Sequence, residues 1–124
     1  MSTPEFKISV AVRALPEQSD PSQDAHAFAY TVTIRNTGSV AAQLVARHWI
    51  ITDAAGHVEE VRGLGVVGHQ PLLQPGESFE YTSGARIATP TGTMRGTYFG
   101  ITDDARWFDT PIPEFVLAAA SSLH

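Results

Sequence analysis

The stretch GLGVVGHQPLLQPGESFEYTSG, residues 63–84, decides between two folds. It begins with the G-x-G-x-x-G pattern of dinucleotide-binding proteins, in which a strand leads into the glycines and a helix leads out. A helix cannot follow here, because proline inside a helix costs about 3 kcal/mol or more, and Pro71 would fall in its second turn. Pro75–Gly76 would end it again and instead predicts a turn before an alternating strand from Ser78. The stretch therefore favours a β fold over a Rossmann domain.

Alternation with a period of two extends over most of the chain. Phe6, Ile8, Val10 and Val12 alternate with polar or small residues, which is the pattern of a strand with one buried and one wet face. The expected strands, bounded by turn residues, cover residues 6–13, 28–35, 42–53, 57–62, 78–83, 93–102, 106–109 and 112–117. No window free of glycine and proline shows a helical period. About seven or more short strands with turns between them predict an all-β, antiparallel β-sandwich.

Length and composition predict a single domain over residues 1–124. The core is expected at about 7–117, with a polar, proline-rich loop at 15–25 and a tail at 120–124. A hydrophobic share of 43% and a charged share of 17% are ordinary for a globular protein and too apolar for a disordered one. The absence of cysteine excludes disulfides and thiolate sites and fits the reducing cytoplasm. Neither a signal peptide nor a membrane-spanning run is recognisable, so we expect a cytoplasmic protein.

The charge balance argues against two classes of partner. The net charge is −5, from 8 Lys+Arg against 13 Asp+Glu, and Lys7 is the only lysine. Nucleic acids and anionic membranes are bound through clustered basic residues, and none cluster in this sequence. We therefore expect neither nucleic acid nor a membrane as a partner.

The glycine triplet leaves one functional alternative open. A glycine-rich loop can bind a small anion through its backbone N–H groups without any helix. Gly63, Gly65 and Gly68 would supply those groups, and Arg62 and His69 flank them with charge. Against this stands the simpler interpretation that the glycines provide positive φ angles or bulges at the end of a strand.

Other chemical motifs are absent or weak. There is no P-loop, no GxSxG and no HExxH pattern, so the sequence predicts no enzyme and no cofactor. Adjacent Glu59 and Glu60 would point to opposite faces of a strand. Asp103 and Asp104 suit a turn, although with Asp109 they offer a weak alternative site for a divalent cation. Five histidines are present, and the last of them, at position 124, is expected to lie in the tail.

The aromatic residues suggest a second kind of surface. Most of them should lie in the core, and one or two are expected on the surface as anchors for an interaction. This set comprises Trp49, Phe79, Tyr81, Tyr98, Phe99, Trp107 and Phe108.

The residues from Ala46 to Gly84, ARHWIITDAAGHVEEVRGLGVVGHQPLLQPGESFEYTSG, resemble the core of the ApaG family. The following TPTGTMRGTYF and the closing IPEFVLAA (Ile112 to Ala119) are similar to the rest of that family, so the resemblance covers about residues 7–117. It implies a fibronectin type III-like or immunoglobulin-like sandwich. It also implies an association with cobalt resistance and magnesium efflux, from which the alternative name CorD derives. The same domain occurs in eukaryotic F-box proteins and in a polymerase-interacting protein, where it resembles a protein-binding module, and no enzymatic activity defines the family.

Three functional hypotheses follow. The first is a non-catalytic module that binds another protein, through an exposed apolar patch or an open edge strand. The second is a binding protein for a small anion, pyrophosphate or nucleotide, at residues 63–68. The third is a weak divalent-metal binder. The sequence leaves the identity of the partner and the oligomeric state open.

Overall fold

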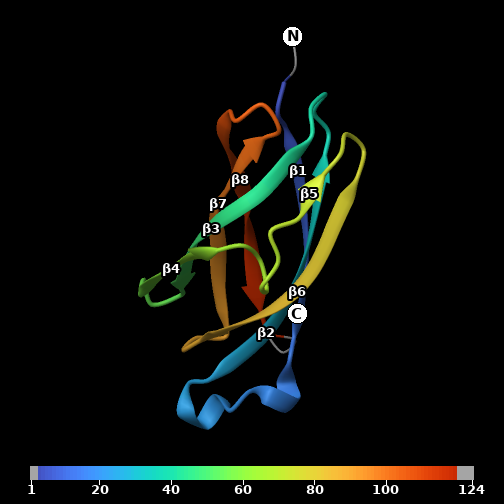
Figure 1. Ribbon diagram of the computed structural model, residues 1–124. Coiled ribbons are helices and arrows are strands. Elements are labelled where there is room, and N and C mark those ends of the chain that lie inside the picture. The colour runs from blue at the N-terminus through green and yellow to red at the C-terminus, as the bar shows by residue number, and fades with distance from the viewer. Residues whose placement is uncertain (1–2, 120–124) are drawn as a thin grey trace.

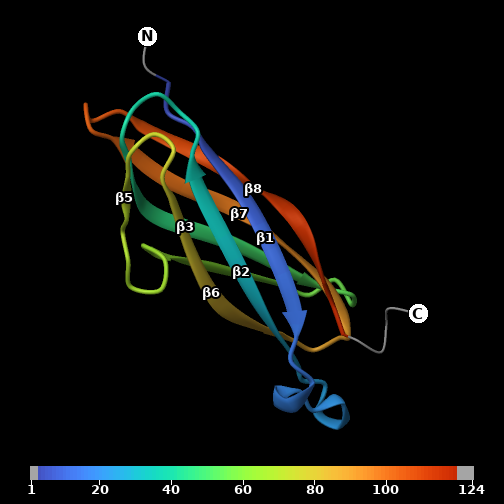
Figure 2. The ribbon, with the colours of Figure 1, turned by 90° about the vertical axis from the view of Figure 1, so that its right-hand side faces the viewer.

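The computed structural model describes residues 3–119, which form two packed antiparallel sheets (Figure 1). The smaller sheet has the order β1 (Phe6–Ala14), β2 (His26–Asn36), β6 (Ser78–Ile87). The larger sheet has the order β4 (Val58–Leu64), β3 (Ala42–Asp53), β7 (Thr91–Thr102), β8 (Trp107–Ala118), and β5 (Leu72–Leu73) also pairs with β3. In Figure 2 the smaller sheet crosses in front of β3 and β7. The predicted immunoglobulin-like or fibronectin type III-like sandwich is confirmed.

The core lies between the sheets and is filled mainly by alternate residues of the strands, most regularly in β2. Its largest fully buried side chains are Tyr98, Phe28, Ile34, Leu44, Met94, Leu117 and Val32. Trp49 of β3 packs edge-on against Tyr30 of β2, with ring centroids 5.4 Å apart, and so joins the two sheets. Within this core the hydroxyl groups of Tyr81 and Tyr98 hydrogen-bond to each other. Burial raises the pKa of Tyr81 to about 12 and also raises the pKa of Tyr98.

The strand predictions were right in kind and wrong at several boundaries. The two strands expected at 106–109 and 112–117 are one strand, β8, which begins at Trp107 and whose pairing with β7 shifts register between Met94 and Gly96. Prolines 111 and 113 suggested a break, but an edge strand tolerates proline because one of its sides makes no ladder bonds. The short strand β5 was not predicted. The expected 15–25 loop contains two 3-10 turns, η1 (Pro16–Gln18) and η2 (Pro21–Gln23). The tail at 120–124 lies outside the described residues.

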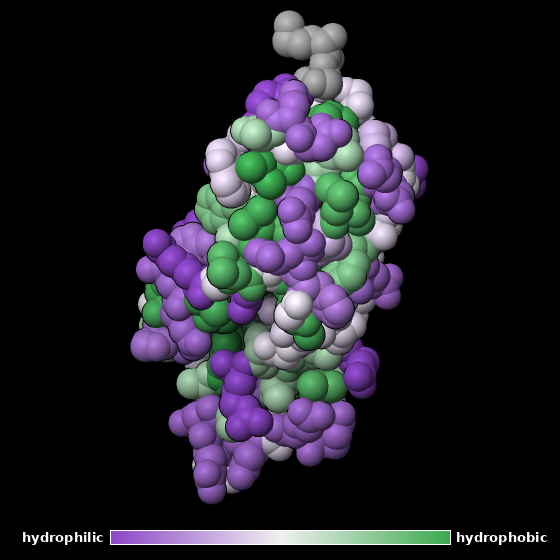
Figure 3. Space-filling model, in the orientation of Figure 1, coloured by the Kyte–Doolittle hydropathy of each residue, from purple (hydrophilic) through white to green (hydrophobic). Residues whose placement is uncertain are grey.

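The two long sides of the sandwich differ. On one side, the rings of Phe6 on β1 and Phe108 on β8 pack 5.1 Å apart and join the sheets. On the other side, the segment between β4 and β5 approaches β6, where the ring of His69 lies 5.6 Å from Phe79. Figure 3 shows hydrophobic patches interrupted by hydrophilic side chains over the upper half of the molecule, above a hydrophilic lower end formed by η1 and η2 (Figure 1). Within residues 3–119, no helix has the length and apolar character needed to cross a membrane.

Candidate functional site

Large apolar side chains lie in solvent on the outer face of the larger sheet. Leu64 of β4 is opposite Ala46 of β3, and Ala46 is opposite Phe99 of β7. Trp107 of β8 lies one step further along, opposite Ile101 of β7. The exposed fraction is 74% for Leu64, 68% for Trp107 and 37% for Phe99. We call this set the apolar row, and it crosses β4, β3, β7 and β8 on the side away from the core. Its members are Leu64, Ala46, Phe99, Ile101 and Trp107.

The outer face of the smaller sheet has the opposite character. Its strands direct mainly Lys, Arg, Ser, Thr and Glu outwards, and Thr31 and Thr82 hydrogen-bond across it at 2.8 Å. Among the described residues, the exposed large hydrophobic side chains lie on the larger sheet or its β5 extension, apart from Val67 in a turn. They are Val58, Leu64, Leu72, Phe99, Trp107 and Val116. The wet face of an antiparallel sheet is normally polar, so the outer face of the larger sheet is unusual in exposing large apolar side chains.

Within the apolar row, Leu64 and Phe99 stand on either side of a hollow of about 420 Å³. Ala46 lies between them, and this small residue leaves the space that a longer side chain would fill. The complete lining is Ala46, Arg47, His48, Arg62, Gly63, Leu64 and Phe99. We call this depression the Ala46 hollow.

Two basic side chains and one carboxylate lie beside the Ala46 hollow. Nε2 of His48 lies 2.8 Å from Oε1 of Glu60, and Nη2 of Arg62 lies 3.7 Å from the same oxygen. The hydrogen bond to His48, helped by the Arg62 charge, lowers the pKa of the Glu60 carboxyl. The side chain of Arg62 is 74% exposed, so its long contact with Glu60 is a weak surface pair. Arg62 can therefore turn to a second carboxylate.

The first glycine of the triplet lies in β4, and the second directly follows the end of that strand. Gly63 is opposite Arg47, and a Cβ atom at Gly63 would stand 2.8 Å from Nη1 of Arg47. That guanidinium donates hydrogen bonds to the carbonyls of Leu64 at 3.1 Å and Gly65 at 2.9 Å. The N–H of Gly65 donates to the carbonyl of Val45 at 2.7 Å. Gly63 thus makes room for Arg47, and Gly65 extends the pairing of β4 with β3.

The third glycine belongs to a tight turn. Val66 and His69 exchange two backbone hydrogen bonds of 2.8 and 2.9 Å, and the residues between them have φ angles of 48° at Val67 and 80° at Gly68. Two positive φ angles define a type I′ turn, which favours glycine. Gly65 also has a positive φ of 66°, and a Cβ there would stand 2.5 Å from the carbonyl oxygen of His69. A turn follows the glycines in place of a helix, so the argument against a Rossmann domain holds.

The predicted flanking residues have different surroundings. Arg62 lies on the outer face of β4 beside Glu60, whereas the ring of His69 packs against Phe79 of β6. The side chains of Arg62 and His69 therefore contact different residues. Binding of pyrophosphate or nucleotide at Gly63–Gly68, with Arg62 and His69, stays a prediction.

The carboxylate pairs have the placement that the sequence indicates. Glu60 contacts His48 on the outer face, while Glu59, opposite Ile51, lines a separate hollow on the inner side of the larger sheet. Asp103 and Asp104 lie in the turn between β7 and β8.

In that turn, the Thr102 hydroxyl and the Arg106 Nε group both donate to Asp104. These bonds lower the pKa of the Asp104 carboxyl. Within residues 3–119, no group of three or more His, Asp or Glu side chains is placed to hold a metal ion. His124 lies outside the described residues.

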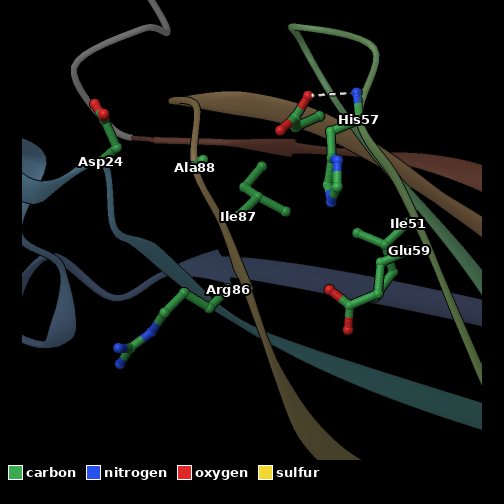
Figure 4. Close-up of a pocket in the computed structure, with 8 residues that line it drawn as sticks. Asp24, Ile51, His57, Glu59, Arg86, Ile87 and Ala88 are labelled. Carbon is green, nitrogen blue, oxygen red and sulfur yellow. Dashed lines mark hydrogen bonds between the residues drawn. The ribbon is translucent and has the colours of Figure 1, made fainter.

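A further hollow, of about 250 Å³, opens beside His57 (Figure 4). Its buried carboxylate, Asp53, accepts hydrogen bonds of 2.9 Å from the N–H groups of Ala55 and His57, and so closes the hairpin between β3 and β4. In Figure 4 the side chains of Asp24 and Arg86 extend away from His57, so these charges do not converge on one point. We therefore interpret Asp53 as a structural cap of the hairpin between β3 and β4.

Sequence reasoning found part of the apolar row. It placed Phe99 and Trp107 among the aromatics and expected one or two of that set at the surface, which the exposed fractions confirm. It missed Leu64 and Ala46, because their place opposite Phe99 depends on strand register. Sequence reasoning ended this strand at residue 62 and treated the following glycines as a loop motif, whereas β4 continues to Leu64.

Comparison with known proteins gives consistent results. The ApaG domain family matches residues 16–102. Protein ApaG of Ralstonia nicotianae is 66% identical over 124 residues, which is 100% of both chains, and Protein ApaG of Thiobacillus denitrificans is 59% identical over 120 residues, covering 97% of this chain and 94% of its own. A crystal structure of an ApaA protein from Bordetella pertussis superimposes with a TM-score of 0.92 at 59% identity, covering 94% of this chain and 95% of the other. The fold, the matched segment and the full-length similarity together show that this chain belongs to the ApaG domain family.

Proposed function

We propose that this chain is a non-catalytic binding module that acts in the cytoplasm and docks a partner protein on the outer face of its larger sheet. The observation that carries the proposal is the apolar row, with Leu64, Phe99 and Trp107 exposed on one face while the opposite face is polar. Tryptophan is enriched among the residues that dominate binding energy at interfaces. Contiguous exposed apolar surface is a mark of interaction sites on soluble domains.

The energetics favour this interpretation. Full burial of a large apolar side chain contributes about 1.5–3 kcal/mol. Leu64 and Trp107 are mostly exposed, so a partner that covers both gains most of that contribution at two positions. Phe99 lies between them in the row and would be covered by the same partner. Such a gain offsets a substantial part of the free-energy cost of association, which is about 4–15 kcal/mol.

The arrangement of titratable groups supports a role without catalysis. Glu60 and Asp104, whose pKa values are lowered, are occupied by neighbouring His, Thr or Arg side chains. The cobalt and magnesium association implied by the ApaG resemblance would then act through the partner. On this proposal the metal-related phenotype depends on the docking face.

Site-specific photo-cross-linking in living cells tests the docking proposal. A benzophenone amino acid is placed at Leu64 or Trp107, and at Ser9 or Ala11 on the outer face of the smaller sheet as matched controls. We expect one protein to be cross-linked from the first two positions and from neither control. Trp107→Ser should weaken binding of that purified protein about tenfold, which corresponds to about 1.4 kcal/mol. Equal cross-linking from both sheets, or none from either position on the larger sheet, would refute the proposal.

A further inference from the structure

Building on the proposed docking function, we infer that the Ala46 hollow receives one large apolar side chain from a partner segment that carries a carboxylate beside it. The apolar side chain enters between Leu64 and Phe99, and the carboxylate faces Arg62 and His48. The partner is thus an acidic, apolar peptide segment.

The shape of the hollow selects a single protruding side chain. Its base is formed by Ala46 and the backbone of Gly63, and its walls by the larger Leu64 and Phe99. A Cβ atom at Gly63 would point to the other face of the sheet, toward the Arg47 guanidinium, so the depth of the hollow depends on the small side chain of Ala46. Well-packed pockets of this kind, ringed by other contacts, are where interface energy concentrates.

The charges select the neighbour of that side chain. The basic side chains on the face of the hollow are His48 and Arg62, and Glu60 contacts both of them from outside. At the opposite end of the row, Asp109 of β8 stands across from Phe99. A carboxylate is therefore attracted at the β4 end and repelled at the β8 end, which gives the bound segment a direction.

Selection from a library of random short peptides provides the first test. The full chain is immobilised, and we expect the enriched peptides to share a large apolar residue next to Asp or Glu. Enrichment of peptides that lack a carboxylate, or of no peptide, would overturn the inference.

Titration of one enriched peptide, as a synthetic compound, provides the second test. Ala46→Leu fills the hollow and should weaken binding about tenfold or more. Arg62→Glu should weaken it severalfold, with a smaller effect at high salt, because salt screens exposed charges. The matched controls are Ala11→Leu and Arg35→Glu on the outer face of the smaller sheet, and both should bind within about twofold of the unaltered chain.

Folding of each variant is checked by circular dichroism and by its urea midpoint. Should Ala46→Leu prove unstable, Leu64→Ala removes one wall of the hollow from an edge strand and should also weaken binding. Unchanged binding in a folded Ala46→Leu variant would overturn the inference.

The two proposals can fail separately. If a protein is cross-linked from Trp107 but peptide binding is unaffected by Ala46→Leu, the docking proposal is retained and the hollow is rejected as the site that determines specificity. Sedimentation of the chain at increasing concentration addresses a further occupant, a second copy of the chain. Self-association that Ala46→Leu abolishes would assign the hollow to that second copy and refute the peptide.

Discussion

Alanine substitutions in the glycine triplet should destabilise the protein by unequal amounts. Gly65 and Gly68 both have positive φ angles, of 66° and 80°, but they differ in free space. A Cβ at Gly65 would stand 2.5 Å from the backbone oxygen of His69, whereas a Cβ at Gly68 would meet nothing within 4 Å. A structural role for the triplet therefore predicts a larger loss at Gly65.

The magnitudes follow from these contacts. A non-glycine residue in the left-handed region costs about 1–2 kcal/mol, and this is the whole expected cost of Gly68→Ala. Gly65→Ala adds an overpacking cost of about 1–3 kcal/mol, because its neighbour is backbone, for a total of about 2–5 kcal/mol. Gly63→Ala displaces only the flexible Arg47 guanidinium and its two hydrogen bonds, at about 1 kcal/mol.

Urea unfolding followed by tryptophan fluorescence measures these losses, since Trp49 is buried and becomes exposed on unfolding. A matched series in saturating pyrophosphate reports on anion binding, because a ligand of the folded state raises its stability. Equal losses at Gly65 and Gly68, or a larger loss at Gly68, would refute the structural account of the triplet. A pyrophosphate-induced stabilisation that disappears in Gly68→Ala would instead favour the anion hypothesis.

Three further predictions concern stability. Asn36→Ala should cost about 3 kcal/mol in urea unfolding, because the buried Asn36 side chain makes three hydrogen bonds to the backbone that alanine cannot replace; a loss below about 1 kcal/mol would contradict this role. Stability should fall as pH rises above about 10, by about 1.4 kcal/mol per pH unit for each of Tyr81 and Tyr98, because unfolded tyrosine ionises near pH 10 while burial keeps the folded phenols protonated. A Tyr81→Phe, Tyr98→Phe double variant should flatten this dependence of stability on pH, and an unchanged slope would refute the assignment. Asp53→Ala should cost about 1–2 kcal/mol and speed amide exchange at His57, which hydrogen exchange measures against an exposed control such as Glu17→Ala.

The sequence predicts the fold well because the smaller sheet follows the simplest rule. In β1 and β2 the alternation is unbroken, from Phe6 to Val12 and from Phe28 to Ile34, so buried and wet faces separate cleanly. The type I′ turn at Val67–Gly68 was harder to predict from the sequence, since valine rarely adopts a positive φ. Glycine spacing alone suggested a ligand, and only the contacts of each glycine reveal separate structural reasons.

The larger sheet shows why the candidate site could not be found from periodicity. Leu44 and Trp49 of β3 both face the core although they are an odd number of residues apart, which strict alternation forbids. The register shift between Leu44 and Ala46 accommodates this by adding one residue to β3 relative to β7. It also turns Ala46 outward, opposite Phe99 and Leu64, and so aligns the apolar row. Removing the extra residue, by deleting Val45, would move Leu44 to the outer face unless the strand slipped. The same irregularity that completes the core thus positions the proposed docking face, and a shortened β3 should lose stability and partner binding together.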